Sequence, residues 1–534
     1  MLDLRDLAEG QELRADLCIV GAGPAGLAVA AELRGAGREV LLLESGGPEP
    51  VPGAQGLGVG TVSGDTRYGA TPLTGTRHRQ VGGTAHLWDI SLDGADHGVR
   101  LIPFGDEDLR GAPSWRAAWP LDAGDLAPFY ARAHELLGLG PVRYDAAPWT
   151  APDAAPLALR DVDTDVFRFA PGERLSRDLR DRVTADPSCR IATHATATEL
   201  VVEHARVDHV VVASAPGRRH RVRCREVVLA AGGIENARLL LASARGRGGL
   251  GNDHDLVGRT FMDHPLVRAG MLRSRPGIRA ALGFYDHRTV DGSRVMGRLV
   301  VGRGRLGGEL PGSAFYLLPR PAGYDPELAS QLRRAVLARD AGSVVAALRH
   351  PRAVAGVARG VVARRRDAWP EMSRGGWSRQ SGPARRWPDL ELVQRCEQVP
   401  DRTNRVVLSE RRDALGAPVA DVHWTWTDDD RAGAAAAQVL LAQAFASAGL
   451  GRTDLVREPD GSAQLLGGTH HHMGATRMSA DPAAGVVDPD GRLHGVANVY
   501  VTGSSVFPTS GTPNPTLTIL ALAARLAAHL RAQP

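Results

Sequence analysis

The sequence predicts an α/β protein built from at least two packed units, and three observations carry this prediction. The chain has 534 residues, more than one simple core usually holds. Its N-terminal region runs through a short apolar stretch, a glycine-rich turn, a helical pattern and a second apolar stretch. Its C-terminal region contains another apolar stretch, which ends in Gly503-Ser504, and closes with a long alanine-rich helical pattern.

The first of these patterns is a dinucleotide-binding unit. Asp16–Val20 is long enough for a buried strand, 27–34 is helical, and Glu39–Leu43 is a second strand that ends at Glu44. Gly21 permits the tight turn, Gly23 lets the backbone approach a pyrophosphate, and Gly26 lets helix and strand pack closely. The helix N-terminus stabilises the phosphate charge. The predicted contacts in this unit are Gly21, Gly23, Pro24, Ala25, Gly26, Glu44 and Ser45.

Glu44 argues against one kind of nucleotide but does not identify the one that binds. A carboxylate at this position accepts hydrogen bonds from ribose hydroxyls and repels a 2′-phosphate, which argues against NADP. The unit itself does not separate FAD from NAD.

Composition and charge exclude several other classes. Hydrophobic residues make up 43% of the chain and charged residues 23%, and the net charge is only +4. A nucleic-acid partner needs a concentrated basic face, so none is expected. Arginines gather between 333 and 366. Solvated helix faces explain this excess, and a docking surface for an anionic partner or a membrane is the alternative.

The cysteines and the N-terminus predict a cytoplasmic protein without a bound metal. The four cysteines show neither metal-binding nor redox spacing. The first residues contain no apolar stretch that could serve as a signal peptide. Because no run of about 18 apolar residues occurs, no transmembrane segment is expected either.

The most specific motifs lie in the last seventy residues. They read His470-His-His472-Met-Gly-Ala-Thr476-Arg477-Met478, and then Asn514-Pro515-Thr516-Leu-Thr518. These motifs resemble the glucose–methanol–choline (GMC) oxidoreductase family, and within it the branch of pyranose oxidases and sugar dehydrogenases. The resemblance implies that His472 and Asn514 are catalytic and face a flavin. Without it, a histidine triplet would suggest a surface tract or a metal clip, and Asn514 a helix cap.

Further segments match the same family. Val81-Gly82-Gly83-Thr84-Ala-His86-Leu-Trp88 resembles the segment along the flavin ring. Covalently flavinylated pyranose oxidases carry a histidine directly before the tryptophan; Leu87 stands there, so non-covalent FAD is expected. Asp263-His264 is tempting as an acid–base pair, but a structural role is expected. The further cofactor contacts that the resemblance implies are Gly82, Gly83, Thr84, Trp88, Ala197, Ala231, Gly232, Gly503, Ser504, Asn514, Pro515 and Thr516.

The resemblance also implies the domain organisation. An interleaved, Rossmann-like FAD-binding domain would comprise residues 12–95, 185–265 and 466–534. Residues 96–184 would link the domains and cover the flavin. A substrate domain with a mainly antiparallel sheet would fill 266–465, with helices expected over 325–368.

The implied function is FAD-dependent oxidation of an alcohol. A primary or secondary hydroxyl of a sugar, glycoside or cyclitol would give a hydride to flavin N5, while His472 takes the hydroxyl proton and Asn514 hydrogen-bonds the oxygen. Oxygen, a quinone or another carrier could accept the electrons, and the sequence does not predict an oligomeric state. The alternatives are a non-redox, lyase-type enzyme, oxidation of a non-sugar alcohol such as a sterol, and a protein that binds FAD without turnover.

Overall fold

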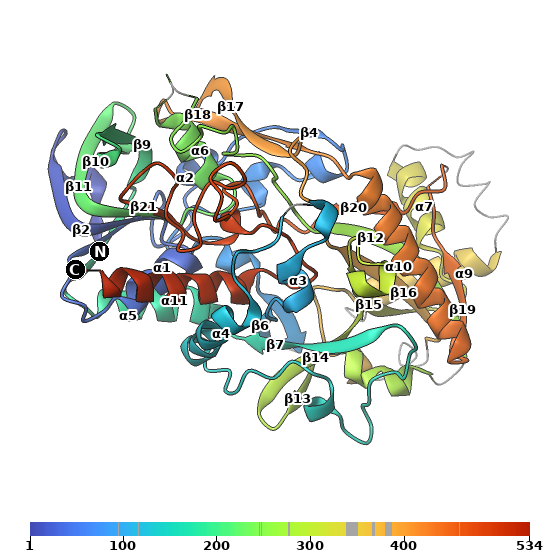
Figure 1. Cartoon of the computed structure of the whole chain (residues 1–534). Helices are drawn as coiled ribbons and strands as arrows, with labels where there is room; N and C mark the ends of the chain where they lie inside the picture. The colour runs from blue at the N-terminus through green and yellow to red at the C-terminus, as the bar shows by residue number, and fades with distance from the viewer. Residues whose placement is uncertain are drawn as a thin grey trace.

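The computed structural model describes residues 1–533 except 94–95, 116, 245, 247, 276–277, 338–350, 366–368, 380–386 and 459. Two large sheets lie in different halves of the molecule, and helices cover both (Figure 1).

The first sheet has eight strands in the order β1-β8-β3-β2-β11-β10-β9, with β21 beside β11. Its parallel centre follows from sequence: the neighbouring runs Leu17–Val20 and 40–43 are buried on both faces, as parallel strands require. The strands β9 and β10 extend the sheet as an antiparallel hairpin. The bounds are β1 (Leu2–Asp3), β2 (Glu12–Val20), β3 (Val40–Leu43), β8 (Cys189–Thr193), β9 (Thr196–Glu203), β10 (Arg206–Ala215), β11 (Arg218–Leu229) and β21 (Val499–Val501).

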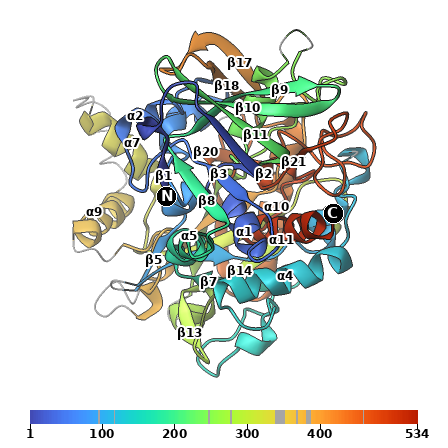
Figure 2. The same ribbon diagram turned by 90° about the vertical axis from the view of Figure 1, so that its left-hand side faces the viewer.

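A layer of helices packs under this sheet. The C-terminal helix α11 (Thr516–Ala532) contacts α1 (Pro24–Glu32) and α4 (Ala123–Leu137), and α5 (Arg177–Thr184) lies on the other side of α1 (Figure 2). The helix α11 is buried on most of its faces, which explains its composition of leucine and alanine. The two ends of the chain therefore build one domain together.

The second sheet has ten strands in the order β19-β12-β16-β15-β14-β7-β6-β5, with β13 beside β14 and β20 beside β12. All its strand pairs are antiparallel. Helix α10 (Asp428–Ser447) covers one face and begins at Thr427, whose side chain caps it. The bounds are β5 (Ile90–Asp93), β6 (Asp96–Leu101), β7 (Asp163–Ala170), β12 (Pro265–Ser274), β13 (Arg288–Val290), β14 (Ser293–Val301), β15 (Ser313–Arg320), β16 (Asp389–Cys396), β19 (Gly451–Leu455) and β20 (Gln464–Gly468).

The predicted fold class is confirmed, with two differences in detail. Residues 96–184, expected to link domains and cover the flavin, contribute β6 and β7 to the second sheet. Phe167 and Phe169 of β7 pack there with Tyr316 and Leu318, whereas Val99 and Leu101 of β6 join the core of the first sheet, and no short sequence motif predicts either arrangement. A third small sheet joins β17 (Arg405–Arg412) and β18 (Pro418–Trp424) to β4 (Val62–Gly64), far away in the sequence.

Two helices occupy the predicted helical stretch 325–368: α7 (Pro326–Leu337) and α9 (Pro351–Arg365). Residues 338–350 and 366–368 of that stretch, with several of its arginines, lie outside the described residues. Among the helices described, none has the length and apolar character needed to cross a membrane.

Candidate active site

A cavity of about 180 Å³ lies along the C-terminal edge of the first sheet. Both sequence regions singled out above reach it: the N-terminal glycine turn at Gly21 and Gly23, and the histidine triplet His470–His472. Ligands of open α/β sheets bind at this edge, where the strands end.

Most of the predicted cofactor contacts line this cavity. They are Gly21, Gly23, Pro24, Ala25, Glu44, Ser45, Gly83, Thr84, Trp88, Ala197, Ala231, Gly232, Gly503, Ser504 and Pro515. Four others are not part of its lining: Gly26, Gly82, Asn514 and Thr516. Gly26 packs against Gly21, whose carbonyl oxygen would lie 2.0 Å from an added Cβ, so its role is the predicted helix–strand contact. Gly82 packs in the same way against Ser176 and His86, and Thr516 is buried in the first turn of α11.

Glycine at two positions is required by close backbone approach. A Cβ on Gly83, where φ is +56°, would lie 2.8 Å from the Cα of Gly23. A Cβ on Gly233 would lie 2.4 Å from the carbonyl oxygen of His472. The first contact closes the glycine turn against the flavin-ring segment, and the second brings the histidine triplet up to the end of β11.

Glu44 holds the glycine turn as well as facing the cavity. Its carboxylate accepts hydrogen bonds from the N–H groups of Ala22 at 3.0 Å and Gly46 at 2.9 Å. Burial raises the pKa of Glu44, although these N–H groups oppose the rise. Two lone pairs are therefore engaged within the protein, and those that remain can accept from a ribose.

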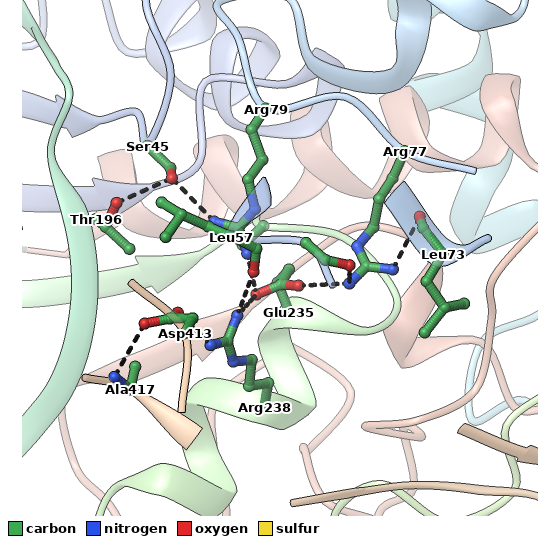
Figure 3. A network of polar contacts seen from close by, with 12 residues as sticks. Ser45, Leu57, Leu73, Arg77, Arg79, Thr196, Glu235, Arg238, Asp413 and Ala417 are labelled. Carbon is green, nitrogen blue, oxygen red and sulfur yellow. Dashed lines mark hydrogen bonds and ion pairs between the residues drawn. The ribbon is translucent and has the colours of Figure 1, made fainter. Parts of the chain in front are cut away.

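A buried ionic network forms one wall of the cavity (Figure 3). Glu235 pairs with Arg77 at 2.9 Å, Arg79 at 2.6 Å and Arg238 at 3.2 Å, and Arg238 also pairs with Asp413 at 2.6 Å. Burial alone would raise the pKa of Glu235, but the three guanidinium groups outweigh it and lower this pKa. Three cations face two anions, which leaves this wall one positive charge in excess. Sequence reasoning missed the network because its members lie far apart in the chain.

These features fit FAD. The N-terminus of α1 has no side-chain cap, so its free N–H groups face the cavity at Gly23. The excess charge of the arginine wall, with Arg79 also donating to Ser45 at 2.9 Å, complements a pyrophosphate. Ala231, Gly503 and Ile519 add small and apolar groups to the lining, to which the three histidines also belong.

Asp263 organises the histidine triplet. Its carboxylate accepts from the backbone N–H groups of His470 and His471, both at 2.8 Å, and from the Thr469 hydroxyl at 3.1 Å. His470 is held at φ +61°, a left-handed conformation that is strained for histidine. The structural role expected of Asp263 is therefore to shape the loop that presents three imidazoles to the cavity.

Among the described residues, Asp263, His470 and His472 form a group that could ligate a metal, with ligand atoms within 4.8 Å of one another. The carboxylate already accepts from His264, Thr469, His470 and His471. We therefore assign Asp263 to the loop and not to a metal.

His471 is connected to the second sheet through His264. The Nδ1 atoms of the two rings lie 2.8 Å apart, and Nε2 of His264 lies 2.9 Å from the carbonyl oxygen of Gly511. Burial lowers the pKa of His264 to about 3 and that of His471 well below its ordinary value, so both are neutral near pH 7.

His472 has different surroundings. Its ring lies 5.6 Å from Phe261 and 6.3 Å from His470, and its Nε2 is buried with no hydrogen-bond partner among the residues that the structure describes. Burial lowers its pKa well below the ordinary value, and Arg77 of the arginine wall lowers it further. His472 lines the cavity as well.

Asn514 precedes α11, whose N-cap residue is Pro515. Its Oδ1 accepts from Nη1 of Arg395 at 2.5 Å, and Arg395 also donates to the carbonyl oxygen of Thr512 at 2.6 Å. His471 is connected to the same loop through His264, whose Nε2 lies near the carbonyl oxygens of Ser510 and Gly511. These contacts link Asn514 with His471, whereas the family resemblance pairs it with His472, and that pairing stays a prediction.

The histidine nearest the expected flavin-linking position is engaged elsewhere. Nε2 of His86 lies 3.0 Å from the carbonyl oxygen of Val81, and Leu87 is 43% exposed. His78 does line the cavity.

Comparison with known proteins agrees with this architecture. Residues 400–523 match a GMC oxidoreductase model, 63–262 an FAD-binding domain, and 19–48 an NAD(P)-binding Rossmann-like domain. Pyridoxine 4-oxidase from Mesorbium loti has a similar fold, with a TM-score of 0.51 and 17% identity over 97% of this chain and all of that one. Formate oxidase superposes with a TM-score of 0.52 and 16% identity, covering 98% of this chain and 99% of that one.

Curated relatives extend the likeness to sequence. Paromamine 6′-oxidase from Streptomyces fradiae is 27% identical over 96% of this chain and 90% of its own length. The fructose dehydrogenase large subunit from Gluconobacter japonicus is 29% identical over 58% of this chain. The aligned region spans about half of that relative, 47% of its length.

The Rossmann-like sheet with its glycine turn and the cavity along its edge define an FAD-binding protein. Its residues 400–523 match the GMC oxidoreductase family, and paromamine 6′-oxidase is similar to it along nearly the whole chain, so the chain resembles the GMC oxidoreductases.

Proposed function

We propose that this protein oxidises the hydroxyl group of a carbohydrate-like alcohol to a ketone or aldehyde, with His471 as the base and Asn514 as the hydrogen-bond donor. The single observation that carries the proposal is the neutral imidazole of His471, which lines the cavity and is connected through His264 to the loop that leads to Asn514. A neutral imidazole that reaches the site of reaction is what a general base requires.

The choice of His471 over His472 rests on the residues that each of the two histidines contacts. His471 is anchored by His264, which in turn contacts the loop that leads to Asn514. The ring of His472 lies against Phe261 and His470, and no contact described links it to the loop that leads to Asn514. His472 remains the alternative, and the rates of flavin reduction in His471→Ala and His472→Ala distinguish the two.

The side chains of the protein then have separate roles in the reaction. FAD held by the glycine turns and the arginine wall would supply the hydride acceptor. Asn514 donates a hydrogen bond to the substrate oxygen and fixes its position. His471 accepts the hydroxyl proton as the carbinol carbon loses its hydride. Arg395, next to Asn514, favours negative charge on that oxygen.

The names of relatives support a carbohydrate-like substrate. Besides a fructose dehydrogenase, they include a C-glycoside 3-oxidase from Microbacterium trichothecenolyticum, 33% identical over 25% of this chain. A second candidate is a small non-sugar alcohol, because 2-methyl-1,2-propanediol dehydrogenase from Mycolicibacterium austroafricanum is 27% identical over 63% of this chain. Oxygen, a quinone or another carrier would serve as electron acceptor.

An anaerobic flavin-reduction screen tests the proposal. The yellow protein is mixed with sugars, glycosides, cyclitols, short diols and sterols, and the flavin absorbance is followed. We expect bleaching by at least one carbohydrate-like alcohol. Dithionite serves as the positive control, and bleaching by dithionite with none of the alcohols would contradict the proposal.

We further propose that the FAD is not covalently linked, because Nε2 of His86 is engaged by Val81 and Leu87 replaces the linking histidine. Acid precipitation should release all of the flavin into the supernatant. Flavin that stays with the polypeptide would point to His78, which lines the cavity.

A further inference from the structure

Two buried side chains lie directly behind the proposed reacting pair. His264 contacts His471, and Arg395 contacts Asn514. Their exposed fractions are 0% and 2%, so neither can meet a substrate itself. The hydrogen-bonding capacity of each determines which atom of its partner is left free for a further hydrogen bond.

Two neighbouring carbonyl groups determine which ring nitrogen of His264 donates a hydrogen bond and which accepts one. Its Nε2 lies 3.1 Å from the oxygen of Ser510 and 2.9 Å from that of Gly511, and carbonyl oxygens only accept. Nε2 therefore carries the proton of the neutral ring, and Nδ1 is an acceptor. Because Nδ1 of His471 lies 2.8 Å from that acceptor, it must be the donor. The unprotonated nitrogen of His471 is then Nε2.

The polarity of Arg395 is fixed by its chemistry, since a guanidinium only donates. The atom of Asn514 that faces it at 2.5 Å is consequently the oxygen Oδ1. Arg395 is itself held by the Thr512 carbonyl, and by the rings of Phe167 and Tyr316 at 5.8 and 5.7 Å. If the side-chain amide of Asn514 flipped, its NH₂ group would face the N–H groups of Arg395. Its Nδ2 is left as the donor on the other side.

We propose that His264 and Arg395 are positioning residues that impose opposite polarity on the reacting pair, an acceptor at Nε2 of His471 and a donor at Nδ2 of Asn514. The inference rests on the proposed function. An alcohol satisfies both atoms at once, because its O–H donates to His471 and its oxygen accepts from Asn514. A carbonyl product can use only Asn514, so the same arrangement favours the alcohol over its product.

The tautomer of His471 can be read without any turnover. We would record long-range ¹H–¹⁵N imidazole spectra of the holoenzyme labelled on its 18 histidines, and assign His471 as the signals lost in His471→Ala. The expected pattern is a protonated Nδ1 and an unprotonated Nε2 in the parent, changing in His264→Leu. A protonated Nε2 in the parent, or an unchanged pattern in His264→Leu, would overturn the role of His264. Either result is independent of whether any alcohol is oxidised.

Kinetics supply the second readout for His264. His264→Leu removes the acceptor and should slow flavin reduction by about 10²-fold or more, the lower range of general-base catalysis. His264→Asn keeps an acceptor oxygen near the Nδ1 position and should recover most of that loss at equal FAD content. The matched control is His220→Leu, which removes a buried histidine of β11 that bonds only to Ser214 in the contacts described. Equal slowing in the Leu and Asn variants would reject the polarity argument.

Arg395 is tested by a double-variant cycle with Asn514. If Arg395 acts through Asn514, Arg395→Met combined with Asn514→Ala should reduce flavin no more slowly than Asn514→Ala alone. Arg395→Lys retains one donor and should be faster than Arg395→Met. Independent, multiplicative slowing in the double variant would show that Arg395 does not work by holding Asn514.

Discussion

The two ends of the cavity differ in the charge of their buried polar groups. At the nucleotide end, charges are paired inside the protein: Glu235 and Asp413 hold three arginines, and Glu44 caps backbone N–H groups. At the reacting end, burial lowers the pKa of His471 and of His472, and the ring of His471 is held by another neutral imidazole, that of His264. The paired end is suited to holding a charged ligand, whereas neutral imidazoles at the other end are suited to accepting a proton.

The strongest test of the nucleotide end is Gly23→Glu. The new side chain would place volume and negative charge at the free N-terminus of α1, so we expect colourless protein with almost no FAD. Flavin content per chain is measured by absorbance. The control, Gly53→Glu, lies where an added Cβ meets nothing within 4 Å, and it should stay yellow. Full flavin in Gly23→Glu would place the cofactor elsewhere.

The ionic wall predicts a smaller but still large effect. Glu235→Gln leaves three buried arginines with Asp413 as their remaining carboxylate, and breaking buried pairs in this way costs about 3–5 kcal/mol. The free energy of unfolding is measured by denaturant titration at saturating FAD. Glu135→Gln breaks an exposed pair with Arg132 and should cost about 1 kcal/mol or less. Similar losses in both variants would mean that the wall is not a buried network in solution.

Asn514→Ala addresses the reacting end alone. Loss of one preorganised donor at a reacting oxygen typically slows the reaction by about 10²–10³-fold, while FAD binding should persist. Stopped-flow reduction under anaerobic conditions gives the rate. A variant with parent-like reduction would leave Asn514 without a part in the reaction.

The neutral imidazoles also predict a pH dependence of stability. The pKa of His264 is about 3 in the folded state against 6.5 for an unperturbed histidine, so the unfolded chain binds the proton first. Stability is full above pH 6.5 and falls as the pH drops toward 3. Between pH 7 and pH 5 the parent should lose about 2 kcal/mol more than His264→Leu. Parallel unfolding curves for the two proteins would show that His264 titrates normally.

Sequence alone predicted the nucleotide end better than the reacting end, and the reason is physical. Strand, glycine turn and terminal acid are contiguous at 16–44, so their spacing determines their geometry. The reacting end instead depends on contacts between distant residues. His264 and His471 are separated by 207 positions, and Arg395 and Asn514 by 119. Within the triplet, the family resemblance predicts His472 as the catalytic histidine, whereas these long-range contacts favour His471 in our proposal.

The same distinction applies to the fold. Buried parallel strands read as short apolar runs and were placed correctly, as at 40–43. The strands β6 and β7 carry polar residues among apolar ones, and sheet membership comes from partners such as β14. Their place in the second sheet therefore needed the structure.

The most direct test of the account compares three single variants, His470→Ala, His471→Ala and His472→Ala, by anaerobic stopped-flow with one substrate from the screen. We predict that His471→Ala keeps its FAD but reduces it about 10²–10⁴-fold more slowly, while the other two stay within about tenfold of the parent. Raising the pH should partly restore His471→Ala, because a pre-ionised alcohol needs no base. Slow reduction in His472→Ala with a fast His471→Ala would return the catalytic role to His472. Three fast variants would contradict histidine-based alcohol oxidation altogether.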